Sequence, residues 1–138
     1  MSRGLAAQGD ARLRELGGGV ECASAIDGAR RLAAGSILPA LMSCFLEHES
    51  KPFDLLRELR RVLRPDGAVV IKVPNLACWD RLRRGDRWCG FRYPDHVNYL
   101  TPTTLARLAA QAGYRVVRQG ASDRVPTIDN MYAVLGPA

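Results

Sequence analysis

The hexapeptide AVVIKV, from Ala68 to Val73, constrains the fold more than any other stretch of the sequence. It consists of β-branched and other apolar residues, with Lys72 as its single polar residue. A nearly continuous apolar run of this length is typical of a parallel strand that is covered on both faces. The segment therefore predicts an inner strand of an α/β sheet.

An amphipathic helix is predicted directly before this strand. Pro52 suits a first helical turn, and apolar residues recur at intervals of three and four from Phe53 to Leu63, with arginines between them. The tetrapeptide Arg64-Pro65-Asp66-Gly67 has the composition of a turn and ends the helix. This order of helix, turn and strand is half of an α/β unit.

The C-terminal third predicts one more helix and two more strands. Thr101 suits an N-cap, Pro102 suits the first helical position, and Gly113 ends an apolar stripe. The segments YRVVRQ and MYAVL then predict two strands, at residues 114–119 and 131–135. Together with the preceding elements they indicate an α/β fold with a parallel sheet and a final pair that can be antiparallel.

The N-terminal part is less strongly patterned. Residues 1–16 predict a helix that ends at Gly17-Gly18-Gly19, and residues 20–23 predict a short strand. Ser24, with Asp27 three residues later, predicts the start of a helix that runs to Ala34. The apolar run from Ile37 to Phe45 then has the length of another strand.

Length and composition predict one globular domain. The chain has 138 residues and 47% hydrophobic content, and no apolar run approaches the roughly 20 residues that a bilayer span requires. The N-terminus lacks the continuous apolar segment of a secretory signal, so we expect a cytoplasmic protein with no membrane partner.

The net charge of +6 comes almost entirely from arginine. A basic surface can attract phosphates. Residues 81–87 have no aromatic side chain among their arginines, which favours a solvated face over a nucleic-acid site. The four cysteines form no CxxC pair and have no histidine at zinc-site spacing. We therefore predict free thiols in a reducing compartment and assign no metal site, with a metal site as the less favoured alternative.

The segment WCGFRYPDHVNYLTP, from Trp88 to Pro102, is unusually rich in reactive side chains for a connection. It holds aromatic residues, a cysteine, an arginine, an aspartate and one of the two histidines of the chain. Connections of this length are commonly functional or disordered, and this one is too aromatic for disorder. A binding loop and a self-packed loop are equally consistent with the residues.

Four motifs, in order and at matching spacing, resemble the C-terminal half of class I S-adenosylmethionine-dependent methyltransferases. They are FLEH after the strand that begins at Ile37, RVLRPDG at the end of the next helix, VPN after the following strand, and the histidine loop with its Thr-Pro helix start. The resemblance covers roughly residues 37–135. It implies a Rossmann-like methyltransferase sheet, here partial, whose last strand is antiparallel, with ligands across the carboxyl ends of the strands.

The resemblance also implies S-adenosylmethionine as the cofactor. Ser43, Cys44 and Glu47 stand at the end of a strand where such enzymes contact it, and the ribose-binding acid would be Glu21 or Asp27. The alternative for Glu47 is a local cap or ion pair.

The front of the family's fold is missing or strongly shortened here. The triple glycine follows a predicted helix instead of the strand that precedes a cofactor-binding turn, and about twenty residues that would form a third strand have no place before Ile37. Residues 1–36 are therefore assigned to a degenerate N-terminal part and residues 37–138 to a methyltransferase C-terminal half, within one domain. Two explanations remain: a truncated enzyme, or a working protein that completes its sheet with a partner chain or as a homodimer.

Methyl transfer mainly needs alignment of the acceptor and, for a hydroxyl or amine, a general base. His96 and His48 are the candidates, with Asp95 expected to orient His96. For His48, a structural hydrogen bond across the top of the sheet is the main alternative.

The substrate side is assigned to a group of residues around the loop. Arg92 could bind a carboxylate or phosphate of the acceptor, or instead pair with Asp95. Aromatic residues could form an apolar wall, and Asn75 faces the site by topology or simply makes a turn. The group consists of Trp88, Phe91, Arg92, Tyr93, Tyr99 and Asn75.

Two functions follow from these assignments. The first is an S-adenosylmethionine-dependent methyltransferase that acts on a small-molecule acceptor. The second is a non-catalytic methyltransferase remnant or interaction module that does not bind the cofactor.

Overall fold

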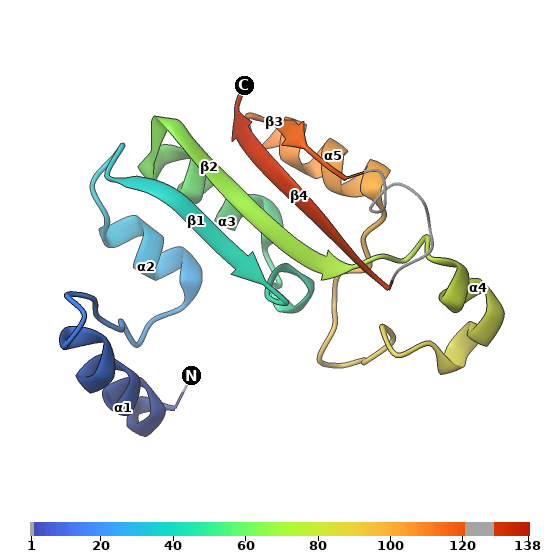
Figure 1. Ribbon diagram of the computed structural model, residues 1–138, viewed down its shortest axis with the longest axis horizontal. Coiled ribbons are helices and arrows are strands. Elements are labelled where there is room, and N and C mark those ends of the chain that lie inside the picture. The colour runs from blue at the N-terminus through green and yellow to red at the C-terminus, as the bar shows by residue number, and fades with distance from the viewer. Residues whose placement is uncertain (1, 121–128) are drawn as a thin grey trace.

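A computed structural model of the protein describes residues 2–120 and 129–138. Its sheet has four strands in the order β1-β2-β4-β3 (Figure 1). β1 and β2 are parallel, whereas β4 is antiparallel to both of its neighbours. The predicted α/β fold with an antiparallel last strand is therefore confirmed. The strands are β1 (Ile37–Ser43), β2 (Leu63–Pro74), β3 (Tyr114–Arg118) and β4 (Asn130–Pro137).

Five α-helices and two short 3-10 turns accompany the sheet in the described residues. No helix among them is long and apolar enough to cross a membrane. The helices are α1 (Arg3–Arg14), α2 (Ala25–Arg31), α3 (Pro52–Val62), α4 (Trp79–Arg84) and α5 (Pro102–Gln111), and the 3-10 turns are η1 (Leu46–His48) and η2 (Gly85–Arg87).

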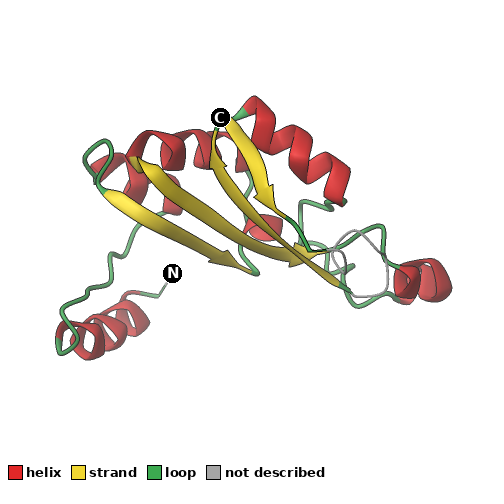
Figure 2. Cartoon of the chain, turned by 45° about the horizontal axis from the view of Figure 1, so that its top comes forward, coloured by secondary structure: helices red, strands yellow, loops and turns green. Residues whose placement is uncertain are grey.

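The core lies between one face of the sheet and the helices α3 and α5. Figure 2 shows helices lying along one face of the sheet. Val69, Ile71 and Val73 of β2 point into this core and are fully buried. Val70 and Lys72, which alternate with them, are only partly buried, and Leu41 of β1 is 73% exposed. The prediction that the AVVIKV strand is covered on both faces is therefore wrong for one face, because the described helices pack on the other.

The predicted turn at residues 64–67 lies within the bounds of β2, as an interruption of its register. Ile37 pairs with Leu63 and Pro39 pairs with Ala68, so four residues of β2 bulge out opposite Leu38. Gly67 is needed here because a Cβ atom at this position would lie 2.5 Å from the carbonyl oxygen of Leu38. Residues 64–67 thus form a bulge, and β2 stays paired to β1 on both sides of it.

The start signals of α3 and α5 are confirmed. Pro52 occupies the first turn of α3. Thr101 caps α5 through a reciprocal pair of bonds with Thr104, because each side chain accepts from the other residue's backbone N–H. The N-termini of α3 and α5 therefore set where the loops that precede these helices end.

The predicted strand at residues 20–23 is wrong. The segment is irregular because the N–H of Val20 donates to the carboxylate of Asp10 in α1, at 2.8 Å, instead of to a neighbouring strand. Gly17, with φ of +77°, ends α1 as predicted, and Figure 1 shows α1 set apart from the sheet. Ser24 caps α2 by accepting from the N–H of Asp27.

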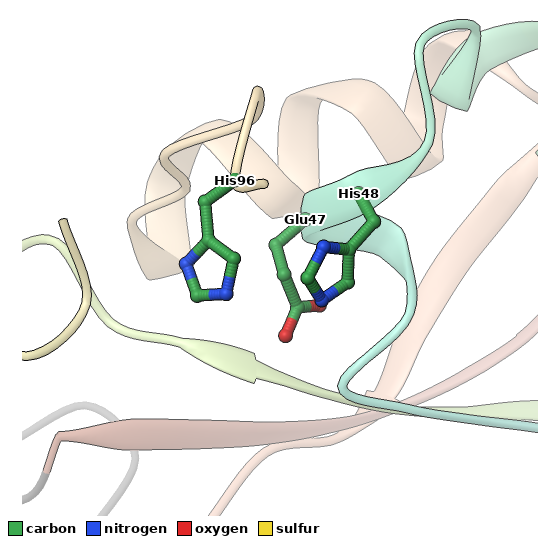
Figure 3. A group of neighbouring side chains, drawn as sticks. All are labelled: Glu47, His48 and His96. Carbon is green, nitrogen blue, oxygen red and sulfur yellow. The ribbon is translucent and has the colours of Figure 1, made fainter. Parts of the chain in front are cut away.

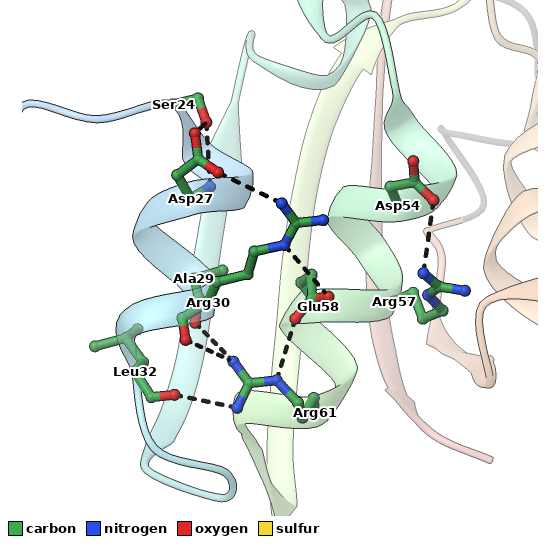
Figure 4. Close-up of polar contacts among 9 residues, drawn as sticks. All are labelled: Ser24, Asp27, Ala29, Arg30, Leu32, Asp54, Arg57, Glu58 and Arg61. Atoms are coloured by element: carbon green, nitrogen blue, oxygen red, sulfur yellow. Dashed lines mark hydrogen bonds and ion pairs between the residues drawn. The ribbon is translucent and has the colours of Figure 1, made fainter.

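α2 and α3 pack side by side through polar bonds (Figure 4). The guanidinium of Arg61 in α3 donates to the carbonyl oxygens of Ala29 at 2.9 Å and Leu32 at 3.1 Å, at the end of α2. Its Nε donates to Glu58 at 3.1 Å. Arg61 therefore adds a charged donor to the carbonyl of Ala29, which also accepts from the N–H of Leu32, and gives the carbonyl of Leu32 a partner.

Candidate functional site

A pocket of about 260 Å³ lies at the carboxyl ends of β1 and β2. Ligands of open α/β sheets bind at this edge. Its walls come from the residues that follow β1, from the loop after α4 and from the start of β4. The lining residues are Cys44, Glu47, His48, Pro74, Trp88, Cys89, Gly90, Arg92, His96, Asp129 and Asn130.

The loop after α4 is fastened to η1 by a run of hydrogen bonds. The carbonyl oxygen of Glu47 accepts from the backbone N–H groups of Val97 and Asn98, at 2.8 and 3.0 Å. The side-chain amide of Asn98 donates in turn to the carbonyl oxygens of Leu46 and Glu49. Two segments about fifty residues apart are thus held as one unit, and each contributes a histidine.

The two imidazole rings lie close together, with centroids 4.7 Å apart and an interplanar angle of 78°. Nδ1 of His48 is 2.8 Å from the carbonyl oxygen of Asp95, and Nδ1 of His96 is 2.8 Å from that of Gly90. Because a carbonyl oxygen can only accept, Nδ1 carries the proton in both rings. Nε2 is therefore the ring nitrogen left for another partner, and Figure 3 shows both rings beside the carboxylate of Glu47.

Asp95 thus acts differently from the sequence prediction. Its backbone carbonyl orients His48, whereas the carbonyl of Gly90 orients His96. The bond from His48 to the carbonyl oxygen of Asp95 is of the structural kind that was the predicted alternative for His48. No ion pair joins Arg92 to Asp95 among the described residues, so the guanidinium of Arg92 is available to the pocket it lines.

The carboxylate of Glu47 is the least expected group of the pocket. Glu47 is 1% exposed, and neither carboxylate oxygen has a hydrogen-bond partner among the described residues. The expectation of a local cap or ion pair for Glu47 is therefore not met. Burial of an ionised carboxylate without a partner is unfavourable. Protonation of Glu47 or binding of a cation would remove this cost.

Cys44, the residue directly after β1, has φ of +52°. Residues other than glycine rarely take this left-handed conformation, and such positions cluster at functional sites. The N–H of Cys44 donates to the carbonyl oxygen of Lys72 at 2.9 Å, which keeps the residue aligned with β2. The turn directs the chain from β1 into η1 at the rim of the pocket.

The aromatic residues of the loop pack mainly against one another. The rings of Trp88 and Phe91 meet edge to face with centroids 5.3 Å apart, and Phe91 meets Tyr99 at the same distance. Trp88 is buried and lines the pocket, whereas Tyr93 is 84% exposed and lies outside this cluster. The predicted aromatic wall thus reduces, on the pocket side, to Trp88.

Asp129, which sequence reasoning missed, anchors this loop. Its carboxylate accepts from the indole of Trp88 at 2.9 Å and from the thiol of Cys78 at 3.3 Å. Burial, with a smaller contribution from Asp129, raises the pKa of the Cys78 thiol above its usual value. Burial likewise raises the pKa of the Cys89 thiol. Both thiols therefore stay protonated near neutral pH.

Three other predicted site residues lie outside the pocket lining. The side chain of Asn75 accepts from the N–H of Ala77, as in the turn given as its alternative role. Glu21 forms an ion pair with Arg31 of α2. Ser43 is the last residue of β1. Their assignments remain predictions.

A larger and shallower hollow, of about 960 Å³, lies over α5 and the end of β3. Arg107 is the only charged residue among those that line it. It brings together no set of groups that could bind and activate a ligand, so the smaller pocket is the better candidate site.

A family model described as a methyltransferase domain matches residues 39–119. The chain belongs to this methyltransferase domain family. No curated protein matches the methyltransferase-domain chain significantly. The match spans most of β1 and all of β2, α5 and β3, together with the loop that lines the pocket.

Solved structures share the fold of this methyltransferase domain. A SAM-dependent methyltransferase from Archaeoglobus fulgidus is 17% identical, with a TM-score of 0.65 over 87% of this chain and 67% of that one. An O-methyltransferase from neocarzinostatin biosynthesis is 17% identical, with a TM-score of 0.66 over 99% of this chain and 40% of that one. A methyltransferase complex with the Trm112 activator of Haloferax volcanii gives 14% identity and a TM-score of 0.59, over 78% and 56%.

The chain therefore spans about 40 to 67% of the length of these three proteins. What it shares with them is the fold.

Proposed function

We propose that this chain forms the acceptor side of an S-adenosylmethionine-dependent methyltransferase and binds a small-molecule acceptor in the pocket beside β1 and β2. The observation that carries the proposal is the convergence of Glu47, His48, Arg92 and His96 on one pocket at the carboxyl ends of parallel strands. A buried acid, two oriented histidines and an available arginine form a set of polar groups typical of a small-molecule site.

His96 is the proposed proton acceptor. Its ring is buried, and the bond from Nδ1 to Gly90 holds Nε2 toward the pocket. A hydroxyl or ammonium of the acceptor would give its proton to the Nε2 lone pair, which leaves the acceptor oxygen or nitrogen as a nucleophile. His48 is exposed and is the second candidate for the same role.

Arg92 is proposed to bind an anionic group of the acceptor, and Trp88 to form the apolar side of the pocket. The O-methyltransferase of neocarzinostatin biosynthesis was solved with 1,4-dihydroxy-2-naphthoic acid, an aromatic acid that also carries hydroxyl groups. A compound of this kind has the groups that the pocket would recognise, and it is a suitable probe. Tyr93 and Tyr99 are proposed as outer contacts of the acceptor, whereas the buried Asn75 is proposed to hold the turn after β2.

The residues present fit only one side of an S-adenosylmethionine site. The end of β1 would face the cofactor from the side of the acceptor pocket. This part of the chain carries Ser43, Cys44 and Glu47. The donor side does not fit, because Gly17 to Gly19 end a helix and Glu21 pairs with Arg31 instead of facing a ligand. No step through the cofactor is derived from this chain.

We further propose that another polypeptide segment completes the sheet, either in a partner chain or in a second copy of this one. β1 pairs only with β2 among the described strands, so its other edge is open. Leu41 and Tyr132, on the face that no described helix covers, are exposed. Open strand edges and apolar faces of this kind favour association. The Haloferax volcanii relative, solved with its activator protein, is a precedent for a methyltransferase with a protein partner.

A non-catalytic interaction module is the second candidate. The missing donor side favours it, since a chain that binds no methyl donor transfers no methyl group. The two functions differ in the pocket, because a remnant has no reason to bind acceptor-like molecules there.

Calorimetric titration tests the proposal with two ligands. We expect the chain to bind 1,4-dihydroxy-2-naphthoic acid in the pocket, and to bind S-adenosylhomocysteine only weakly by itself. Absence of binding by any hydroxylated aromatic acid at millimolar concentration would favour the non-catalytic module. Tight binding of S-adenosylhomocysteine would show that the donor side is complete and would contradict the assignment of a half-site.

A further inference from the structure

We infer that Glu47, His48 and His96 form a binding site for one divalent transition-metal ion of the zinc class. One ligand atom from each residue lies within 4.8 Å of the others, and all three residues line the pocket. Figure 3 shows the carboxylate and the two rings converging from η1 and the loop. Two imidazoles and one carboxylate are a donor set that zinc and neighbouring metals prefer.

The protonation of the rings favours this assignment. Metal-bound histidine usually donates its other ring N–H to a carbonyl or carboxylate, which fixes the tautomer and the ring direction. Both rings here make that bond, from His48 to Asp95 and from His96 to Gly90, each at 2.8 Å. Nε2 is consequently the nitrogen of each ring that can offer its lone pair to a metal ion.

The state of Glu47 is an independent observation. The carboxylate is 1% exposed and has no hydrogen-bond partner among the described residues for either oxygen. A buried carboxylate without a partner costs several kcal/mol if it is ionised. A divalent cation between Glu47 and the two Nε2 atoms would remove this cost and satisfy all three groups together.

The geometry needs only a small contraction. A tetrahedral ion with ligand bonds of about 2.0–2.2 Å holds its ligand atoms roughly 3.4 Å apart. Side-chain rotations can bring the three atoms from their present separations, all within 4.8 Å, to that spacing. Asn98 and the N–H of Val97 already hold the loop against η1, so the two segments that carry the ligands are in place. Three protein ligands leave at least one coordination position facing the pocket.

This site rests on the same residues as the proposed acceptor pocket, but its test is separate. A ring that binds an ion through Nε2 cannot also accept a proton there. With the ion bound, activation of an acceptor hydroxyl would pass from His96 to the metal, which acts as a Lewis acid. If metal does not bind and 1,4-dihydroxy-2-naphthoic acid still does, the metal site is refuted while the acceptor pocket stands with His96 as the base.

Titration of the metal-free, reduced chain with Zn²⁺ and Co²⁺ tests the inference. We expect one ion to bind per chain, a visible absorption band of Co²⁺ in a low-symmetry site, and a higher melting temperature with Zn²⁺. Glu47→Gln and His48→Gln should each weaken binding at least tenfold. The control Glu49→Gln should bind normally, because the Glu49 carboxylate bonds the N–H of Lys51 and lies outside the cluster.

The cysteines need their own control. Cys44 and Cys89 line the same pocket, so the titration is repeated with Cys44→Ser and Cys89→Ser. Binding that these changes abolish would identify a thiolate site and overturn the inference. So would the absence of saturable binding by the unchanged protein, or equal binding by His48→Gln. Since the ring of His48 is exposed, that variant should fold even if Glu47→Gln does not.

Discussion

The indole N–H of Trp88 donates a hydrogen bond of 2.9 Å to the carboxylate of Asp129, at the start of β4. This bond joins the pocket loop to the start of β4, an inner strand of the sheet. The thiol of Cys78, at the beginning of α4, donates to the same carboxylate oxygen. The carboxylate of Asp129 therefore holds Cys78 and Trp88, the residues on either side of α4 and η2.

Asp129→Ala should loosen this connection. Removal of the acceptor leaves the buried indole N–H without a partner, which costs about 1–3 kcal/mol. We expect Cys78 to react with iodoacetamide several-fold faster in the variant at about pH 8, because both its burial and the neighbouring charge raise its pKa in the parent protein. Peptide mapping by mass spectrometry measures the rate for each cysteine.

Asp129→Asn is the matched control, since its amide oxygen still accepts from Trp88. Labelling of Cys22, which is exposed and distant in sequence, should not change in either variant. Equal protection of Cys78 in Asp129→Ala and in the parent protein would show that the carboxylate does not hold the connection.

Arg61→Ala should destabilise the chain by about 1–3 kcal/mol, because carbonyl oxygens at the end of α2 lose their charged donor. Arg57→Ala is the comparison, since Arg57 makes an exposed ion pair with Asp54 at 3.9 Å (Figure 4) and a cation–π contact with Phe53, both within α3, and no bond to α2 among the described residues. Exposed pairs contribute about 0.2–1 kcal/mol. Chemical denaturation measures both, and equal losses would contradict the role of Arg61 as a link between α2 and α3.

Tyr114 should make stability depend on alkaline pH. Its hydroxyl donates to the carbonyl oxygen of Leu56 at 3.0 Å, and burial raises its pKa above the usual value. The folded state therefore keeps the phenolic proton at a pH where the unfolded chain releases it. This contribution is complete below the unfolded tyrosine pKa of about 10 and is lost as pH rises above it.

Tyr114→Phe removes both the bond and the titration. We expect the variant to be about 0.5–1.5 kcal/mol less stable near neutral pH and to lose less stability than the parent between about pH 9 and 11.5. Urea unfolding across that range gives the two slopes. Parallel pH curves would refute the account of Tyr114.

Cys44→Gly should stabilise the fold modestly. Glycine takes a φ of +52° without the penalty of about 1–2 kcal/mol that a side chain incurs, although it also increases the entropy of the unfolded chain. A net gain of about 0.5–1 kcal/mol would raise the melting temperature by about 2–4 °C. Cys44→Ala keeps the left-handed strain and should give no gain, so an equal effect of both changes would show that the backbone angle is not the cause.

Local signals in the sequence identified the elements of the C-terminal part. The apolar run at Ala68–Val73 and the cap at Thr101 each depend on residues within one element, and both are confirmed. The prediction of a strand at residues 20–23 was wrong, because a strand forms only where a neighbouring strand pairs with it. There the carboxylate of Asp10 occupies the N–H of Val20, and no described strand lies alongside.

The candidate site was only partly predictable for the same physical reason. His48 and His96 could be proposed from their chemistry, but their approach depends on how the loop fastens to η1. The burial of Glu47 and the anchoring by Asp129 arise from contacts between distant segments, which no spacing rule contains. The prediction of no metal site considered cysteine spacing and thus could not include this cluster.

Nuclear magnetic resonance with 1,4-dihydroxy-2-naphthoic acid as the probe tests the acceptor pocket most directly. The account predicts saturable shifts of backbone amides in residues 44–48 and 88–97, where the pocket lining lies, and their loss in Arg92→Ala. Saturable shifts centred on Ala106 and Val116 in the hollow over α5, or none at millimolar probe, would contradict it.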